Sequence, residues 1–252
     1  MCNKYILSPL EQFEISSIIP IQFFNLNFTI TNVTIFLFIS LFILTIWFSL
    51  SLYKANIIPN IWQSFKEVLY IITRDLVKDN IGKKGEFYFP FIFLLHIFLL
   101  TCNVSGMIPY GFTLTSHLIF TFGLAFSIFL GINIIGLQTY GFKFFNIFLP
   151  PNVPLIIIPL IITIEIISYF VKVFTLSIRL FANMTSGHTL LKIVSGFAWT
   201  MLLKGGFIAI FHIIPLGLLI VLILLEMGIA FLQAYVFTLL TCIYLNDVLE
   251  LH

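Results

Sequence analysis

The stretch TLSIRLFAN, residues 175–183, lies within a long apolar run and contains one arginine. The length of the run and this single charge together indicate how the chain folds. The run from Val153 to Trp199 is almost uninterruptedly apolar, and as a helix at about 1.5 Å per residue it would be roughly 70 Å long. Even at a tilt of about 40°, a hydrocarbon layer of ~30 Å accommodates only about 26 residues. Arg179 is the only permanent charge between Lys172 and Lys192, and a guanidinium cannot escape an apolar environment by losing its proton. An intramembrane arginine costs roughly 2.5 to 3.5 kcal/mol, which predicts a functional residue with a partner.

The amino-acid composition is typical of a protein that lies in a membrane. Hydrophobic residues make up 60% of it, charged residues 9%, and the mean hydropathy is +1.14. These values predict an all-α polytopic membrane protein rather than a soluble domain. The net charge of +2 is too small and scattered for a nucleic-acid partner. The three cysteines include no CxxC pair, so we expect no disulfide framework, no metal site and no cofactor.

We expect a single integral membrane domain over residues 1–252. The N-terminal segment 1–31 precedes the first span, and its part from Met1 to Pro20 lacks the features of a secretory signal or a transit peptide. Charged and apolar residues then alternate at helical spacing, which predicts an amphipathic surface helix, and a two-span hairpin turned at Pro109-Tyr110-Gly111 comes next. Two long, steeply tilted or near-horizontal helices joined around Lys204-Gly205-Gly206 complete the chain. The expected ranges are 32–52 for the first span, 53–86 for the surface helix, 87–138 for the two-span hairpin, and 153–199 and 207–245 for the long helices.

Polar residues of the long helices fall on stripes. A spacing of seven residues keeps side chains on one helix face, with a drift of about 20° per step. His188 lies nine residues after Arg179 and therefore points away from the arginine face. The first stripe consists of Glu165, Lys172, Arg179 and Ser186, with Asn183 one turn beyond Arg179, and the second of Glu226, Gln233 and Asp247.

Several stretches carry a resemblance to a known family. The signature SIRLFANMTSGH at 177–188 resembles subunit a of F-type ATP synthases, especially the mitochondrially encoded form, with Ser186 where alanine is usual. Further matching stretches occur in the right order along nearly the whole chain. They are SPLEQFEI at 8–15, CNVSGMIPY at 102–110, TSH at 115–117, QAYVFTLL at 233–240 and CIYLND at 242–247, the last resembling plant and protist versions.

The resemblance implies a proton-conducting stator in the mitochondrial inner membrane, without nucleotide chemistry of its own. Its partners would be a rotating c-ring, the peripheral stalk, other membrane subunits and the lipid bilayer. Two half-channels would serve the ring carboxylates, with Arg179 between them. The remaining roles follow residue by residue: Glu226, His188 and Asp247 on the intermembrane-space side, Glu165 on the matrix side, and Asn183 and Gln233 as polar neighbours of Arg179.

Other readings stay open at this point. Arg179 could be an anchor paired with Glu165 or Glu226, while the remaining acids and His188 could be packing or solvated residues. We read Lys172, Lys192 and Lys204 as snorkelling to lipid headgroups, and His96, His117 and His212 as structural. A redox-driven pump subunit is a rival function, although no internal repeat supports it. A secondary transporter is another, although it would show paired broken helices in two halves and the polar groups here are confined to one end of the chain.

Charge also predicts the orientation. Six Lys and Arg residues lie between Lys54 and Lys84, against only Lys4 before the first span. The positive-inside bias therefore puts the amphipathic segment in the matrix and the N-terminus in the intermembrane space.

Overall fold

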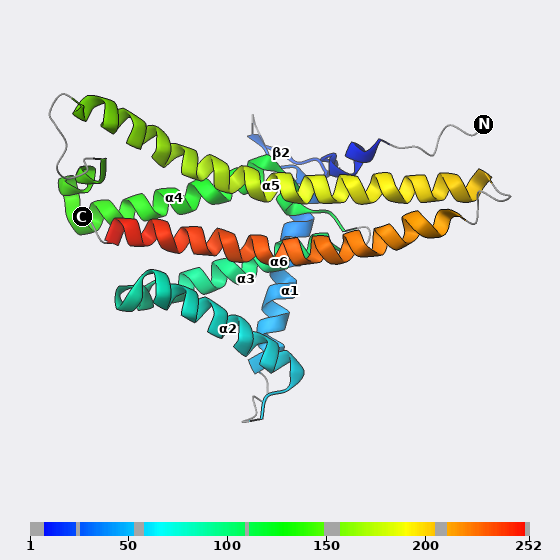
Figure 1. Ribbon diagram of the computed structural model, residues 1–252, viewed down its shortest axis with the longest axis horizontal. Helices are drawn as coiled ribbons and strands as arrows, with labels where there is room; N and C mark the ends of the chain where they lie inside the picture. The colour runs from blue at the N-terminus through cyan, green and yellow to red at the C-terminus, as the bar shows by residue number, and fades with distance from the viewer. Residues whose placement is uncertain are drawn as a thin grey trace.

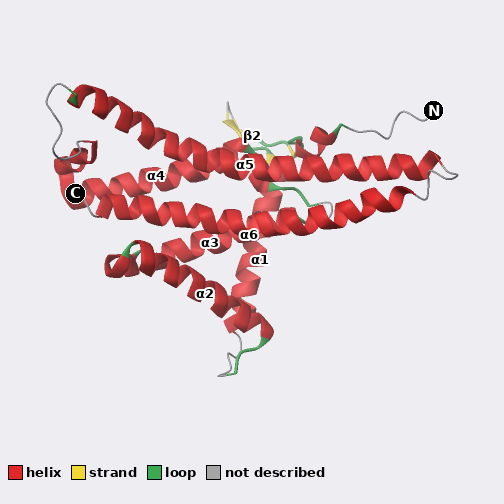
Figure 2. Ribbon diagram, in the orientation of Figure 1, coloured by secondary structure: helices red, strands yellow, loops and turns green. Residues whose placement is uncertain are grey.

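The structure is a computed structural model that describes residues 8–23, 26–52, 58–108, 111–148, 157–204 and 211–249. Helices dominate it (Figure 2). Within the described residues, five helices are long and apolar enough to cross a membrane. The α-helices are α1 (Asn32–Leu52), α2 (Ile61–Asn80), α3 (Phe89–Gly106), α4 (Leu118–Tyr140), α5 (Ile158–Lys204) and α6 (Ile213–Leu249). The 3₁₀ helices are η1 (Pro9–Phe13), η2 (Gly82–Phe87), η3 (Leu114–Ser116) and η4 (Gly141–Phe148).

The two long helices run side by side along the longest axis of the molecule, and α1 runs crosswise to them (Figure 1). Both long helices exceed the length of an upright span, because α5 alone has 47 residues and is about 70 Å long. The protein is therefore an all-α polytopic membrane protein.

The helix bounds differ from the expected ranges by a few residues. The expected first span coincides with α1, and α2 occupies the middle of the expected amphipathic segment. Both long helices start and end later than expected. Pro159 is tolerated in the first turn of α5, and helix-compatible residues carry α5 on to Lys204. The expected turns at Pro109-Tyr110 and Gly205-Gly206 lie outside the described residues.

The core forms where α3, α4, α5 and α6 meet. Leu176 and Leu180 of α5 belong to one buried cluster with Ala234 and Phe237 of α6. Polar bonds between helices join this core, as expected where water is excluded. They include His96 Nδ1 with Thr238 Oγ1 at 3.2 Å, Asn103 Nδ2 to Ala230 O at 3.1 Å, Thr121 Oγ1 with Ser177 Oγ at 3.2 Å, and Tyr169 Oη to Asn133 Oδ1 at 2.7 Å.

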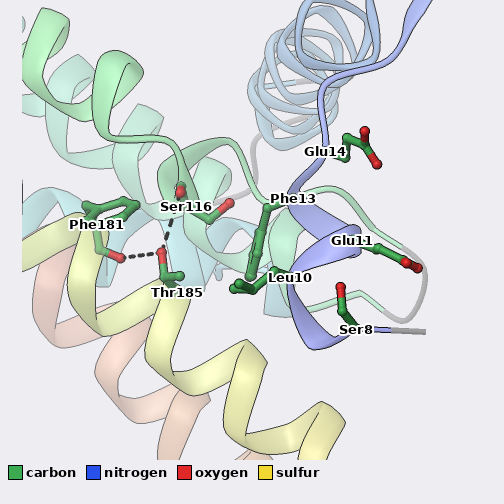
Figure 3. Close-up of a pocket in the computed structure, with 8 residues that line it drawn as sticks. All are labelled: Ser8, Leu10, Glu11, Phe13, Glu14, Ser116, Phe181 and Thr185. Atoms are coloured by element: carbon green, nitrogen blue, oxygen red, sulfur yellow. Dashed lines mark hydrogen bonds between the residues drawn. The ribbon is translucent and has the colours of Figure 1, made fainter. Parts of the chain in front are cut away.

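The N-terminal segment has structure that the sequence pattern did not predict. Two small antiparallel ribbons follow η1: β1 (Ser17–Ile19) with β4 (Ile30–Thr31), and β2 (Gln22–Phe23) with β3 (Leu26–Asn27). Lys192 donates from Nζ to the Ser8 carbonyl at 3.3 Å, so this segment is attached to the second half of α5. A cavity of about 480 Å³ lies between η1, η3 and α5, and Thr185 donates within it to the Phe181 and Ser116 carbonyls at 2.9 and 3.4 Å (Figure 3).

Candidate functional site

Arg179 lies on the face of α5 that points away from the core. Leu176, Leu180 and Met184 form the buried stripe of this part of α5, whereas Arg179 is exposed in the isolated chain. Within the described part of the chain, no carboxylate forms an ion pair with Arg179. The anchor reading, in which Glu165 or Glu226 pairs with Arg179, has no support in these contacts.

The exposed side chains nearest to Arg179 along its face of α5 are small. Thr175, Ala182 and Ser186 precede or follow it by four, three and seven residues, and all three are exposed. Small residues on a membrane helix let another helix approach closely. The α5 backbone is therefore accessible to close approach on this face.

His188 and Glu226 meet on the opposite side of α5, between the two long helices. His188 Nε2 lies 3.4 Å from Glu226 Oε1, close enough to pair but not aligned as a hydrogen bond. The Glu226 side chain is almost fully buried. The nine-residue spacing between Arg179 and His188 correctly predicted that these two side chains point to different sides.

Gly187 is the residue that makes room for the Glu226 carboxylate. A Cβ atom at Gly187 would lie 2.7 Å from Glu226 Oε1 and 2.9 Å from its Cδ, closer than real Cβ contacts come. Glycine within a helix costs about 1 kcal/mol relative to alanine, so this close approach explains its presence. The sequence offered one signal that we did not use, a glycine directly before His188.

Further buried polar atoms lie on the elements that contact this pair. Asn103 Oδ1, Thr115 Oγ1 and His117 Nε2 have no protein hydrogen-bond partner among the described residues. Asn103 bonds to the carbonyl of Ala230, one turn after Glu226, and η3 bonds through the Ser116 carbonyl to α5 one turn before His188. Burial lowers the pKa of His117, which favours its neutral form. The sequence analysis assigned these residues no role in the site, since His117 was read as structural and Asn103 and Thr115 were quoted only for the family resemblance.

Asp247 is not brought to the Glu226 pair. It follows Glu226 by 21 residues on α6, about 31 Å along a helix axis. Instead, Asp247 Oδ2 lies 3.6 Å from Lys172 Nζ, and the Lys172 ammonium lies 5.3 and 5.9 Å from the ring centroids of Tyr244 and Tyr169. The Lys172 ammonium thus has partners within the protein, which the reading of Lys172 as a snorkelling lysine did not include.

The other predicted residues occupy the same two helices. Glu165 is half-buried on α5 and forms no ion pair with another described residue. Asn183 is half-buried one turn after Arg179, and Gln233 is buried on α6. No hydrogen bond joins either amide to Arg179 within the described ranges. The described residues contain no group of His, Cys, Asp or Glu that could hold a metal ion.

Comparisons with known proteins agree over nearly the whole length. The family model described as ATP synthase A chain matches residues 33–246. ATP synthase subunit a of Chondrus crispus is 68% identical over 98% of this chain and 98% of its own length. The proteins of the same name from Marchantia polymorpha and Pylaiella littoralis are 50% and 46% identical, each over 97% of this chain and 99% of their own lengths.

A match of this extent decides between the function classes that the sequence left open, because neither a redox pump nor a secondary transporter would match this family over its full length. The chain therefore belongs to the ATP synthase A chain family, as a proton-translocating stator subunit of the F-type ATP synthase and a multi-pass protein of the mitochondrial inner membrane.

Proposed function

We propose that the chain forms two half-channels that exchange protons with the carboxylates of a rotating c-ring, and that Arg179 separates them. The observation that carries this proposal is the exposed Arg179, next to small exposed side chains and without a carboxylate partner among the described residues. A fixed cation there favours the ionised form of each carboxylate that passes it. Each ring carboxylate must then release its proton before it meets Arg179. A permanent positive charge also blocks a direct proton leak between the half-channels.

We assign the His188–Glu226 pair to the half-channel from the intermembrane space. Both groups are able to take up and release protons, and they lie within pairing distance. Buried polar atoms without a protein partner are satisfied by water, which points to a hydrated route past Asn103, Thr115 and His117. Gly187 keeps the carboxylate of Glu226 against the backbone of α5.

We assign Glu165 to the half-channel on the matrix side. It precedes Arg179 by 14 residues on α5, about 21 Å, whereas His188 follows Arg179 by nine, about 14 Å. Glu165 and the His188–Glu226 pair thus lie on opposite sides of Arg179 along α5. Asp247 belongs with Lys172, on the Glu165 side of Arg179, and not with Glu226. Asn183 and Gln233 act as polar neighbours of Arg179, and their amide groups orient water molecules and hydrogen-bond donors near the guanidinium.

Arg179→Ala tests the separation of the half-channels. The measurements are ATP synthesis driven by an imposed proton gradient and passive proton leak, in membranes where assembly of the complex has been verified. We expect synthesis to be lost and leak to rise in Arg179→Ala. Lys143→Ala, which removes a cation outside the two long helices, should leave both near the wild-type values. Normal coupled synthesis in assembled Arg179→Ala would refute the proposal.

A further inference from the structure

A second polar cavity lies at the end of the amphipathic helix α2, far along the chain from the residues of the proton path. It has a volume of about 470 Å³ and is bounded by α2, η2 and the first residue of α3. Its lining contains three cationic side chains and one carboxylate. The lining residues are Tyr70, Arg74, Val77, Lys78, Gly82, Lys83, Glu86 and Phe89.

The chain geometry brings the three cations together. Arg74 and Lys78 are four residues apart and therefore neighbours on one face of α2, a like-charge spacing that destabilises an isolated helix. Gly82 adopts a φ of +71°, a left-handed conformation that glycine enters at no steric cost, and this turn returns Lys83 to the same cavity. None of the ion pairs among the described residues involves these cations or Glu86. With one carboxylate, the lining keeps an excess of positive charge.

The floor of the cavity is apolar and firmly packed. The Tyr70 ring lies edge-on to Phe89 with centroids 5.0 Å apart, and to Phe93 at 5.7 Å, while Val77 is buried beneath. Phe89 begins the membrane-spanning helix α3. The cavity thus lies where the amphipathic helix α2 meets the membrane-spanning helix α3, and cationic and aromatic side chains share its lining.

The rest of α2 fits a helix that lies in a membrane surface. Its inner face is buried on Leu69, Thr73, Leu76 and Val77, whereas Ile61 and Trp62 at its start are 87% and 70% exposed. Exposed large apolar side chains beside lysines and arginines are typical of interfacial helices. A ligand of this cavity would come from the lipid interface itself.

Lys78 in the last turn of α2 also interacts favourably with the helix dipole, a role that needs no ligand. That role does not account for Lys83, which lies beyond the helix in η2, or for Arg74, a full turn earlier. A guanidinium presents a planar fork that matches a phosphate, and an ammonium is a common phosphate partner.

We propose that this cavity binds the phosphate headgroup of an anionic phospholipid, with Arg74, Lys78 and Lys83 on the phosphate and Tyr70 and Phe89 against the upper part of the acyl chains. The lipid neutralises the repulsion between the three cations and holds the junction of α2 and α3 in the interface. This site is independent of the half-channels.

Photochemical cross-linking of the intact complex in nanodiscs tests the proposal. One sample contains a photoreactive phosphatidylglycerol, a second contains a photoreactive phosphatidylcholine, and labelled peptides are mapped by mass spectrometry. We expect phosphatidylglycerol to label residues 70–89 and phosphatidylcholine to label them much less. Arg74→Gln/Lys83→Gln should lower the phosphatidylglycerol signal on the order of tenfold or more, since each basic residue contributes about 1 kcal/mol to anionic-lipid attraction. Lys143→Gln/Lys204→Gln removes the same charge elsewhere and should leave the signal unchanged.

Equal labelling by both lipids, or full labelling of Arg74→Gln/Lys83→Gln, would overturn the proposal. Displacement of the phosphatidylglycerol label by inorganic phosphate alone would assign the site to a free anion instead. A cross-link from residues 70–89 to another protein subunit in place of lipid would also contradict it.

Discussion

Lys172 of α5 and Asp247 of α6 form an ion pair, with Nζ 3.6 Å from Oδ2, that joins the two long helices on the side of Arg179 opposite to His188 and Glu226. Lys172 precedes Arg179 by seven residues and shares its stripe. Asp247 is thus the partner of Lys172, whereas Arg179, on the same stripe, has no carboxylate partner in the described part of the chain.

Asp247→Asn should weaken coupling, because it leaves Lys172 as a second uncompensated cation near the path of the ring carboxylates. Lys172→Gln/Asp247→Asn should recover much of the loss, since removing both charges leaves neither unpaired. The double-mutant cycle, read from proton-driven ATP synthesis per assembled complex, should give an interaction of about 0.5 to 3 kcal/mol. Strict additivity of the two single changes would mean that the pair has no functional coupling.

Glu226→Gln should slow proton access from the intermembrane space roughly a hundredfold, because the shape is kept and the titrating group is lost. The measurement is proton-driven rotation or ATP synthesis, and assembly should stay normal. Glu165→Gln should impair exchange on the matrix side instead. If each variant blocked access from both sides equally, the assignment of the two acids to separate half-channels would be wrong.

Gly187→Ala should reduce proton flow, because the new methyl group would displace the Glu226 carboxylate from His188. Gly196→Ala is the matched control on the same helix, since a Cβ there meets nothing within 4 Å. Alanine also favours the helix over glycine by about 1 kcal/mol at both positions, so helix propensity alone predicts no loss. Proton flow unchanged in Gly187→Ala would show that the carboxylate position is unimportant.

Asn103→Leu should also slow proton flow, because it removes a buried polar group beside the Glu226 turn of α6. Its control is Asn133→Leu, which likewise loses one bond between helices, the one from Tyr169. Both variants should lose a similar amount of stability, about 1 to 3 kcal/mol, measured by thermal denaturation of the complex. Equal proton flow in the two variants would leave Asn103 with a structural role only.

The sequence predicted the helices well and the contacts between them only in part. Run length and composition predicted α1 and the long α5–α6 hairpin, because a membrane span needs a continuous apolar run. Helical periodicity correctly put His188 and Arg179 on different sides of α5. The pairing of Asp247 with Lys172 depends on how far α5 and α6 are staggered, and periodicity within one helix carries no information on that register. The small strands near the N-terminus were missed because segments of two or three residues show no recognisable alternation.

Arg179→Lys is expected to fail although it keeps the formal charge. An ammonium on a flexible stem lacks the planar fork of a guanidinium, and it can lose its proton in a desolvated site, where arginine stays charged. Thr175, Ala182 and Ser186 around Arg179 offer no acid to hold a lysine in its charged form. The measurement is proton-driven ATP synthesis together with passive leak, with Arg74→Lys as the matched control on α2. Coupled synthesis at the wild-type rate in Arg179→Lys would show that charge alone is sufficient, and that the geometry of the guanidinium contributes nothing.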